Sequence, residues 1–201
     1  MVTTMSAAAP ARDAAPRVPT DAELVRRSRT DPEAFAVLFD RYAAMLYRYV
    51  SRRLGPGPAE DVVGETFLVA FGRRARYDLA RDDARPWLFG IATRLVARHH
   101  RDEAARYRAL HRLPAAAEAV PEDAVDDALT AHAARPALAA ALEDLPRRDR
   151  DVLLLIAWAD LSYAEAAQAL GIAVGTVRSR LNRARRKVRA ALGGTDPTKE
   201  V

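Results

Sequence analysis

Hydrophobic residues recur every three or four positions through the first half of the chain, the spacing of helices with one apolar face. Order is expected to begin at Thr20-Asp21-Ala22-Glu23, which has the Ser/Thr-x-x-Glu form of a helix capping box. A second helix start follows at Thr30-Asp31-Pro32-Glu33, with proline in the first turn, where its missing N–H costs nothing. The apolar face of this second helix consists of Phe35, Leu38, Phe39, Tyr42, Leu46, Tyr49 and Val50.

The cluster Gly55-Pro56-Gly57-Pro58 ends that helix, and two more amphipathic helices follow it. One runs from Ala59 to about Arg74, with apolar positions at Val62, Val63, Phe67 and Phe71. The other opens at Pro86-Trp87, after a polar stretch from Tyr77 to Arg85, and runs to about Arg101 with an apolar stripe of Leu88, Ile91 and Leu95. One edge beside this stripe carries Arg94, Arg98 and Arg101. These four helices form a first module, with Trp87 expected in its core.

The helical periodicity fades between about Arg106 and Arg135, which indicates a linker. Prolines occur at Pro114 and Pro121, and acidic residues gather without an intervening basic one at Glu118, Glu122, Asp123, Asp126 and Asp127. Composition alone favours a solvated tether here. Apolar periodicity then returns at Leu138, Leu142 and Leu145 and in the run from Val152 to Ile156, so a second module begins there.

A helix-turn-helix pattern follows in the second module. Leu161-Ser162-Tyr163-Ala164-Glu165 contains another capping box, and the short helix that it opens breaks at Gly171, a residue suited to a left-handed turn. Ile172 and Val174 are apolar plugs, and a second helix begins near Gly175-Thr176. The buried face predicted for this helix consists of Val177, Leu181, Ala184, Val188 and Ala191.

The opposite face of this last helix is strongly basic. Between Thr176 and Ala190 there are seven basic residues and no acidic one, so the helix repels itself unless a polyanion lies opposite. Arginine, asparagine and serine are side chains that contact bases as well as phosphate. The residues predicted to contact DNA are Thr176, Arg178, Ser179, Asn182, Arg183 and Arg186. A solvated basic helix or an RNA-binding arm is the alternative that we weigh against DNA reading.

Composition limits the remaining classes of function. The chain of 201 residues has a net charge of +5 and no cysteine, which excludes disulfides and thiolate chemistry and fits the cytoplasm. No Gly-rich phosphate loop, Ser/His/Asp arrangement or metal-spaced cluster occurs in the sequence, and the adjacent His99 and His100 point in different directions on a helix. We therefore predict no enzyme activity, no catalytic residue, no metal and no cofactor. No stretch is apolar over the length of a membrane span.

The predicted fold class is all-α, with two small helical domains joined by a flexible linker. The N-terminal residues are rich in alanine and proline and lack the apolar core of a secretory signal. The predicted organisation is a disordered tail at 1–19, a first domain at 20–105, an acidic linker at 106–134, a second domain at 135–192 and a disordered tail at 193–201.

The segment from Leu161 to Arg189, with its Leu-Ser-Tyr-Ala-Glu opening and its Gly-Thr-Val-Arg-Ser-Arg-Leu-Asn-Arg-Ala-Arg-Arg core, resembles the fourth region of extracytoplasmic-function sigma factors of the sigma-70 family. Residues 59–68, Ala-Glu-Asp-Val-Val-Gly-Glu-Thr-Phe-Leu, resemble the second-region helix that grips the RNA polymerase clamp. Residues 86–92, Pro-Trp-Leu-Phe-Gly-Ile-Ala, resemble the start of the helix that handles the minus-10 element. The resemblance covers about Asp21 to Leu192.

The resemblance implies a transcription initiation factor whose partners are RNA polymerase core, duplex minus-35 DNA and single-stranded minus-10 DNA. Polymerase contacts are implied at Asp61, Glu65, Phe67 and Leu68. Contacts to the melted minus-10 strand are implied at Arg81, Arg85, Arg94, Arg98 and Arg101, with binding energy rather than ATP driving the melting. Without the resemblance, Asp61 and Glu65 read as an ordinary solvated acidic face.

The chain departs from the family pattern in two helices. Thr93-Arg94 stands where the family commonly has Arg-Asn, and Arg98 stands where it has Asp a little later in the same helix. Gly64 replaces a frequent polar residue in the middle of another helix. The family also implies an anti-sigma protein as a further partner and a linker that threads through the polymerase cleft. We hypothesise that the acidic linker residues imitate nucleic acid in that basic channel.

Two alternatives come from other classes of protein. A dimeric helix-turn-helix regulator needs a dimerisation surface and a sensor or receiver domain, and the first module lacks the βα alternation of a receiver. A helical enzyme acting on nucleic acid needs clustered carboxylates or a metal site. Comigration with polymerase core distinguishes the initiation factor from the regulator, and metal-dependent cleavage of DNA distinguishes the enzyme.

Overall fold

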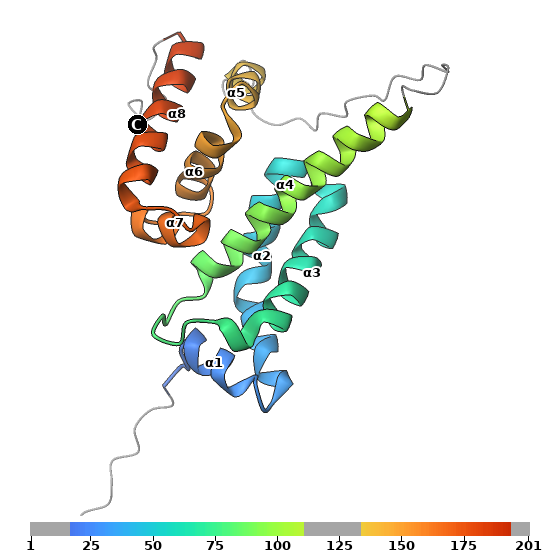
Figure 1. The fold of residues 1–201 in the computed structure, drawn as a ribbon, viewed down its shortest axis with the longest axis vertical. Helices are drawn as coiled ribbons and strands as arrows, with labels where there is room; N and C mark the ends of the chain where they lie inside the picture. Colours follow the sequence, from blue (N-terminus) through green and yellow to red (C-terminus); the bar gives the residue numbers. More distant parts are fainter. Residues whose placement is uncertain (1–16, 111–133, 194–201) are drawn as a thin grey trace, which may run out of the picture.

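Every regular element in the two described ranges, residues 17–110 and 134–193, is a helix in the computed structural model. Figure 1 shows two groups of helices, one from each range. The all-α prediction is therefore confirmed for the described part of the chain. Most of the predicted linker and tails, including the acidic cluster, lies outside the described residues.

The first module is built on three long helices that pack along one another, with a short helix at one end (Figure 1). Its elements are α1 (Asp21–Arg27), the 3-10 helix η1 (Pro32–Phe35), α2 (Ala36–Leu54), α3 (Pro56–Arg73), the 3-10 helix η2 (Arg74–Arg76) and α4 (Arg85–Leu110). The core between α2, α3 and α4 contains Leu46, Tyr49, Phe67, Leu88 and Phe89, each less than a tenth exposed. Trp87 is half-buried and packs against Tyr77, with ring centroids 4.9 Å apart.

The predicted capping box at Thr20 and Glu23 is confirmed, since each side chain bonds the other residue's backbone N–H. Asp21, the first residue of α1, is buried. Its carboxylate accepts hydrogen bonds from the Arg41 side chain at 2.7 Å and from the Ala84 backbone N–H at 2.8 Å. A buried carboxylate needs such partners to offset its lost hydration. Asp21 therefore ties α1 both to α2 and to the segment just before α4.

Two helix boundaries differ from the sequence prediction. Helix α3 begins at Pro56 rather than Ala59, because prolines fit the first helical turn, whose N–H groups have no partner within the helix. Helix α4 extends to Leu110, well past Arg101. This extension is exposed, and the pair of Arg98 with Asp102, four residues apart, supports its start without burial. Hydrophobic periodicity alone could not reveal it.

The second module consists of α5 (Ala134–Glu143), α6 (Arg147–Ala157), α7 (Tyr163–Leu170) and α8 (Val174–Ala191). The capping box at Ser162 and Glu165 opens α7 as predicted. Gly171 ends α7 in the left-handed conformation, with φ 65° and ψ 40°. The helix-turn-helix prediction is confirmed.

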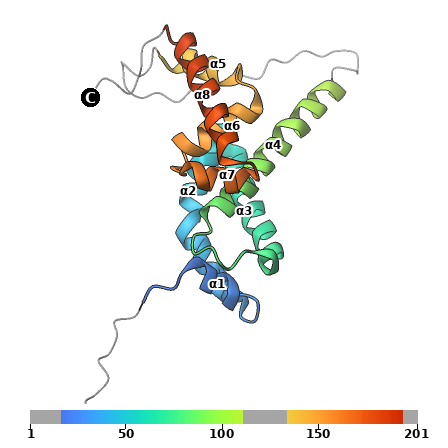
Figure 2. The same ribbon diagram turned by 60° about the vertical axis from the view of Figure 1, so that its left-hand side comes forward.

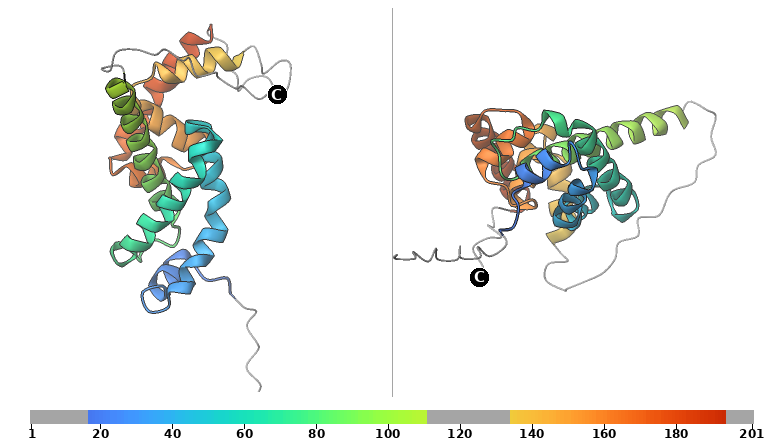
Figure 3. Two further views of the ribbon diagram at one scale, coloured as in Figure 1. Left: turned by 90° about the vertical axis from the view of Figure 1, so that its right-hand side faces the viewer. Right: turned by 90° about the horizontal axis from the view of Figure 1, so that it is seen from below.

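The two modules pack against each other, which the sequence did not predict. Helix α7 lies against the N-terminal half of α4, and one continuous cluster of buried apolar side chains contains residues of both modules. Figures 2 and 3 show α7 beside α4, while α5 and the C-terminal part of α8 lie at the end away from α1. The C-terminal half of α4 projects beyond the bundle.

Candidate nucleic-acid interface

The orientation of α8 is set by its buried apolar edge. Val177, Leu181 and Ala184 are at most 1 % exposed, and they hold α8 against α6 and α7. Val188 is only partly buried and Ala191 is exposed, so the fully buried edge ends at Ala184, about two turns before the predicted end. Because these three side chains are buried against α6 and α7, the opposite edge of the helix faces outward.

The outward edge of α8 carries most of the side chains predicted to contact DNA. Arg178, Ser179, Asn182 and Arg186 are exposed, and Thr176 is half-buried near the start of the helix. The Ser179 hydroxyl donates a hydrogen bond to the Thr176 carbonyl oxygen at 3.0 Å. The helix therefore presents an amide, a hydroxyl and guanidinium groups along one solvent-facing line.

Arg183 differs from the other five predicted residues, because it is held by a buried carboxylate. Its Nε and Nη2 atoms donate to the two Asp149 oxygens, both at 3.1 Å, and the Asp149 side chain is only 6 % exposed. Hydrogen bonds to Asp149 and its charge raise the pKa of Arg183 above its already high ordinary value. This fork-shaped pairing fastens α8 to α6. The sequence did not indicate Asp149 as a partner.

Three of the five arginines predicted to contact the minus-10 strand face the second module. Arg81 donates to the Gln168 side-chain oxygen at 2.7 Å, Arg85 pairs with Glu165 at 3.1 Å, and Arg94 reaches the Ala169 carbonyl oxygen at 3.5 Å. Arg98 instead pairs with Glu65 at 3.2 Å on the exposed side of α4, and Arg101 is exposed. The five arginines thus do not form one open surface.

Glu165 takes part in both the cap of α7 and the contact between the modules. Partial burial raises its pKa, but hydrogen bonds from Ser162 and the charge of Arg85 outweigh this effect. The net result is a pKa below the ordinary value for glutamate, so the carboxylate is charged at neutral pH.

The residues predicted to contact polymerase lie on α3, but they do not share one degree of exposure. Asp61 and Glu65 are exposed, and Leu68 is 73 % exposed, which is unusual for a large apolar side chain. Phe67 is 7 % exposed and packs on Phe39 with ring centroids 4.9 Å apart. Asp61, Glu65 and Leu68 are therefore accessible to a partner, whereas Phe67 supports the helix from the core.

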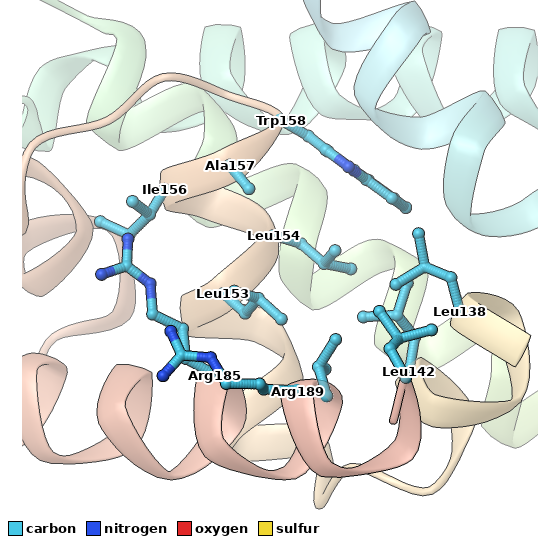
Figure 4. Close-up of a pocket in the computed structure, with 11 residues that line it drawn as sticks. Leu138, Leu142, Leu153, Leu154, Ile156, Ala157, Trp158, Arg185 and Arg189 are labelled. Carbon is cyan, nitrogen blue, oxygen red and sulfur yellow. The ribbon is translucent and has the colours of Figure 1, made fainter. Parts of the chain in front are cut away.

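An apolar groove of about 590 Å³ lies between α5, α6 and α8 in the second module, and the sequence did not reveal it. Figure 4 shows Leu153 and Leu154 of α6 pointing into it, between Leu138 and Leu142 of α5 and the arginines of α8. Arg185 and Arg189 line its edge along α8. In the sequence, only the apolar run from Val152 to Ile156 pointed to this groove. Such a run is explained equally well by a helix that is buried in a core.

Within residues 17–110 and 134–193, no group of histidine, aspartate and glutamate side chains is arranged to hold a metal ion. Among the helices of the same two ranges, none combines the length and apolar character that crossing a membrane requires.

Comparison with known proteins identifies the family. Residues 38–106 match the family model described as sigma-70 region 2, and residues 135–188 match the one described as sigma-70, region 4. The chain is 37 % identical over 142 residues to the probable RNA polymerase sigma-C factor of Mycobacterium bovis, a match that covers 70 % of this chain and 73 % of that protein. The chain belongs to the extracytoplasmic-function sigma factors of the sigma-70 family. As a sigma factor, it directs promoter-specific initiation of transcription.

Other relatives and solved structures of sigma factors agree. The sigma factor is 36 % identical over 156 residues to the ECF RNA polymerase sigma factor SigL of Mycobacterium tuberculosis, covering 77 % of this chain and 86 % of that one. Its fold matches CnrH, solved in complex with the cytosolic domain of CnrY, with a TM-score of 0.61, 26 % identity and coverage of 88 % and 99 %. It also has the fold of RpoE from Bartonella quintana, co-crystallised with the anti-sigma factor NepR, with a TM-score of 0.58, 24 % identity and coverage of 81 % and 98 %.

Proposed function

We propose that the sigma factor reads the duplex minus-35 element with the outward edge of α8. The proposal depends on the orientation of α8, the second helix of the helix-turn-helix. Its buried side carries Val177, Leu181 and Ala184. Its exposed side carries Arg178, Ser179 and Asn182. A helix of this kind enters the major groove with its N-terminal residues toward the base edges. Asn182 suits adenine and Arg178 suits guanine, while Arg186 and Lys187 suit phosphates.

Region 2, the first module, is proposed to hold the melted minus-10 strand along α4 and the segment before it. Arg98 and Arg101 supply exposed cations there, and Arg81, Arg85 and Arg94 supply three more, which contact α7 in the free chain. Single strands are held by such cationic tracks together with base stacking. Binding energy of this kind would favour the melted promoter without nucleotide hydrolysis.

The proposed contact with RNA polymerase core is the exposed side of α3 that carries Asp61, Glu65 and Leu68. An exposed leucine beside two carboxylates suits a partner surface that has an apolar pocket flanked by basic residues. Because CnrH and RpoE were solved with CnrY and the anti-sigma factor NepR, we also propose that an anti-sigma protein binds this chain. We expect the sigma factor itself to act in the cytoplasm, without a cofactor and without catalysing a reaction of its own.

Run-off transcription with purified polymerase core and genomic DNA tests the proposal. The expected result is a set of defined start sites that appear only when the sigma factor is added. Mapping those starts gives the minus-35 and minus-10 sequences for later binding measurements. The proposal would be contradicted if polymerase core began transcription at the same positions without the protein. It would also be contradicted if core and protein together began at no defined position.

A further inference from the structure

A second pocket lies where the two modules meet, and the DNA and polymerase contacts proposed above do not use it. It has a volume of about 400 Å³ and lies between α2, α4, α5 and α6, within the size range of small-molecule sites in proteins. Part of its lining is apolar and is shared with the groove of Figure 4. The rest of its lining is rich in nitrogen bases, with three arginines and a histidine.

The pocket is formed by close and specific packing of the modules. A β-carbon added at Gly90 of α4 would lie 2.4 Å from the Ala169 carbonyl oxygen of α7, so only glycine permits this approach of the two helices. Arg53 of α2 donates to Asp151 of α6 at 2.6 Å, and both side chains are at most 11 % exposed. A buried pair of charges needs good geometry. These two contacts fix the positions of region 2 and region 4 side chains around the pocket.

Two arginines of the lining keep charges that the described part of the chain does not neutralise. Neither Arg52 nor Arg150 forms an ion pair within residues 17–110 and 134–193, and Glu143, which also lines the pocket, is exposed. Arg150 reaches only the backbone carbonyl oxygens of Glu143 and Leu145, both at 3.5 Å. Its Nε–H is buried and meets no hydrogen-bond acceptor among the described residues. Buried donors without an acceptor are rare in proteins, and such a donor suits an anion.

The histidine of the lining lies in a positive field. Burial lowers the pKa of His100, and the charges of Arg53 and Arg150 lower it further, while the charge of Glu103 acts in the opposite direction. His100 is therefore neutral at neutral pH and adds no cation of its own. A field that disfavours a positive imidazole at this place favours a negative ligand.

The apolar part of the lining suits a flat ring. It includes Leu138 and Leu142 of α5, Leu154 of α6 and the half-buried Trp158, whose ring extends toward Leu138 in Figure 4. The guanidinium carbon of Arg52 lies 5.7 Å from the centre of the Trp158 ring. Aromatic rings beside arginine are a common means of holding nucleobases. The pocket therefore combines a place for a ring with unpaired cations.

We propose that this pocket binds a nucleoside polyphosphate, with the base against Trp158 and the phosphates on Arg52 and Arg150. Arginine binds phosphate through parallel N–H donors. A purely apolar ligand would leave the two cations unpaired, and inorganic phosphate would leave the apolar part uncovered. The proposal does not depend on promoter recognition, because none of these three residues is assigned to DNA or polymerase.

Isothermal titration calorimetry of the full chain with ATP tests the proposal. Arg150→Gln and Arg52→Gln each remove one cation of the lining, and Arg148→Gln removes an exposed arginine of α6 that does not line the pocket. The three variants have the same net charge, so only the position of the lost cation differs. The wild type should bind one ATP per chain. Each lining variant should bind it about tenfold more weakly, the value of a charged hydrogen bond, and Arg148→Gln should bind it as the wild type does.

Tripolyphosphate and adenosine, titrated separately, distinguish the two parts of the ligand. Each should bind at least about tenfold more weakly than ATP, because each lacks one set of contacts. Absence of ATP binding, or an equal loss in Arg148→Gln, would overturn the site. Tripolyphosphate that binds as tightly as ATP would overturn the contact between the base and Trp158. Thermal unfolding without ligand checks that the variants fold, and no DNA or polymerase is present, so failure of the proposed function is seen separately.

Discussion

Neighbouring side chains on α8 have different surroundings, and their roles should differ accordingly. Asn182 is exposed with its amide free to meet a base edge, whereas Arg183 forms a two-point pair with the buried carboxylate of Asp149. The residue types were readable from the sequence, and so was the outward direction of the helix edge. The pairing of Arg183 with Asp149 could not be predicted from the sequence, because the two residues lie 34 positions apart and no local pattern links them.

The first prediction contrasts Asn182→Ala with Arg183→Ala. Asn182→Ala should lower affinity for the mapped minus-35 duplex by about 1–3 kcal/mol, the value of one base contact, and leave the melting temperature unchanged. Arg183→Ala should lower the melting temperature as well, because it leaves the Asp149 carboxylate buried and unpaired. Fluorescence anisotropy and differential scanning calorimetry measure the two effects. Equal melting temperatures for both variants would contradict the structural role of Arg183.

The second prediction concerns two adjacent residues of α3. Leu68→Lys should weaken comigration with polymerase core by about 1–2 kcal/mol in binding free energy while the fold stays intact, because Leu68 is largely exposed. Phe67→Ala should instead lower the free energy of unfolding by about 3 kcal/mol or more, because it opens a cavity beside Phe39. Titration with core and urea unfolding separate these outcomes. Wild-type affinity for core in Leu68→Lys would remove Leu68 from the polymerase surface.

Helix starts and turns are the features that the sequence predicted best, because they depend on interactions within a few residues. Both capping boxes and the left-handed turn at Gly171 are present as predicted. The end of α4 was misplaced because its last turns are exposed, so no apolar stripe marks them in the sequence. The start of α3 was misplaced because prolines that end one helix also suit the first turn of the next.

The third prediction tests the turn of the helix-turn-helix. Gly171→Ala should lower the free energy of unfolding by about 1 kcal/mol or more, because its φ of 65° is unfavourable for a residue with a β-carbon. Gly175→Ala should raise it by about 0.5 kcal/mol, since Gly175 lies in α8 with open space around it. Chemical unfolding of both variants measures the signs. An unchanged or raised free energy of unfolding in Gly171→Ala would show that the turn does not require the left-handed conformation.

At the scale of the whole molecule, the sequence predicted two modules but not their packing. Each module has its own periodicity and caps, and the family resemblance describes them one after the other. The contact depends on Gly90, on the distant pair Arg53 and Asp151, and on groups of α7 that look like an ordinary polar helix surface. A mid-helix glycine often marks such a close approach, and in Pro86-Trp87-Leu88-Phe89-Gly90 it was the one available sign.

The fourth prediction follows from the buried cluster shared by both modules. The wild-type sigma factor should unfold in one calorimetric transition, because separating the modules exposes part of a common core. Gly90→Ala should divide this transition into two, whereas Gly72→Ala of α3 should keep one transition, because a β-carbon at Gly72 meets nothing within 4 Å. Two transitions in the wild type would mean that the modules unfold independently despite their contact.

The lack of space at Gly90 also has a consequence for the divergence of related sigma factors. A homologue with alanine or a larger residue at the corresponding site could not keep the same distance between its two DNA-binding parts. In such proteins the two modules should pack with a wider spacing between the helices that correspond to α4 and α7. Homologues that retain glycine there can keep the close approach, so this single site should sort relatives by the spacing of their two modules.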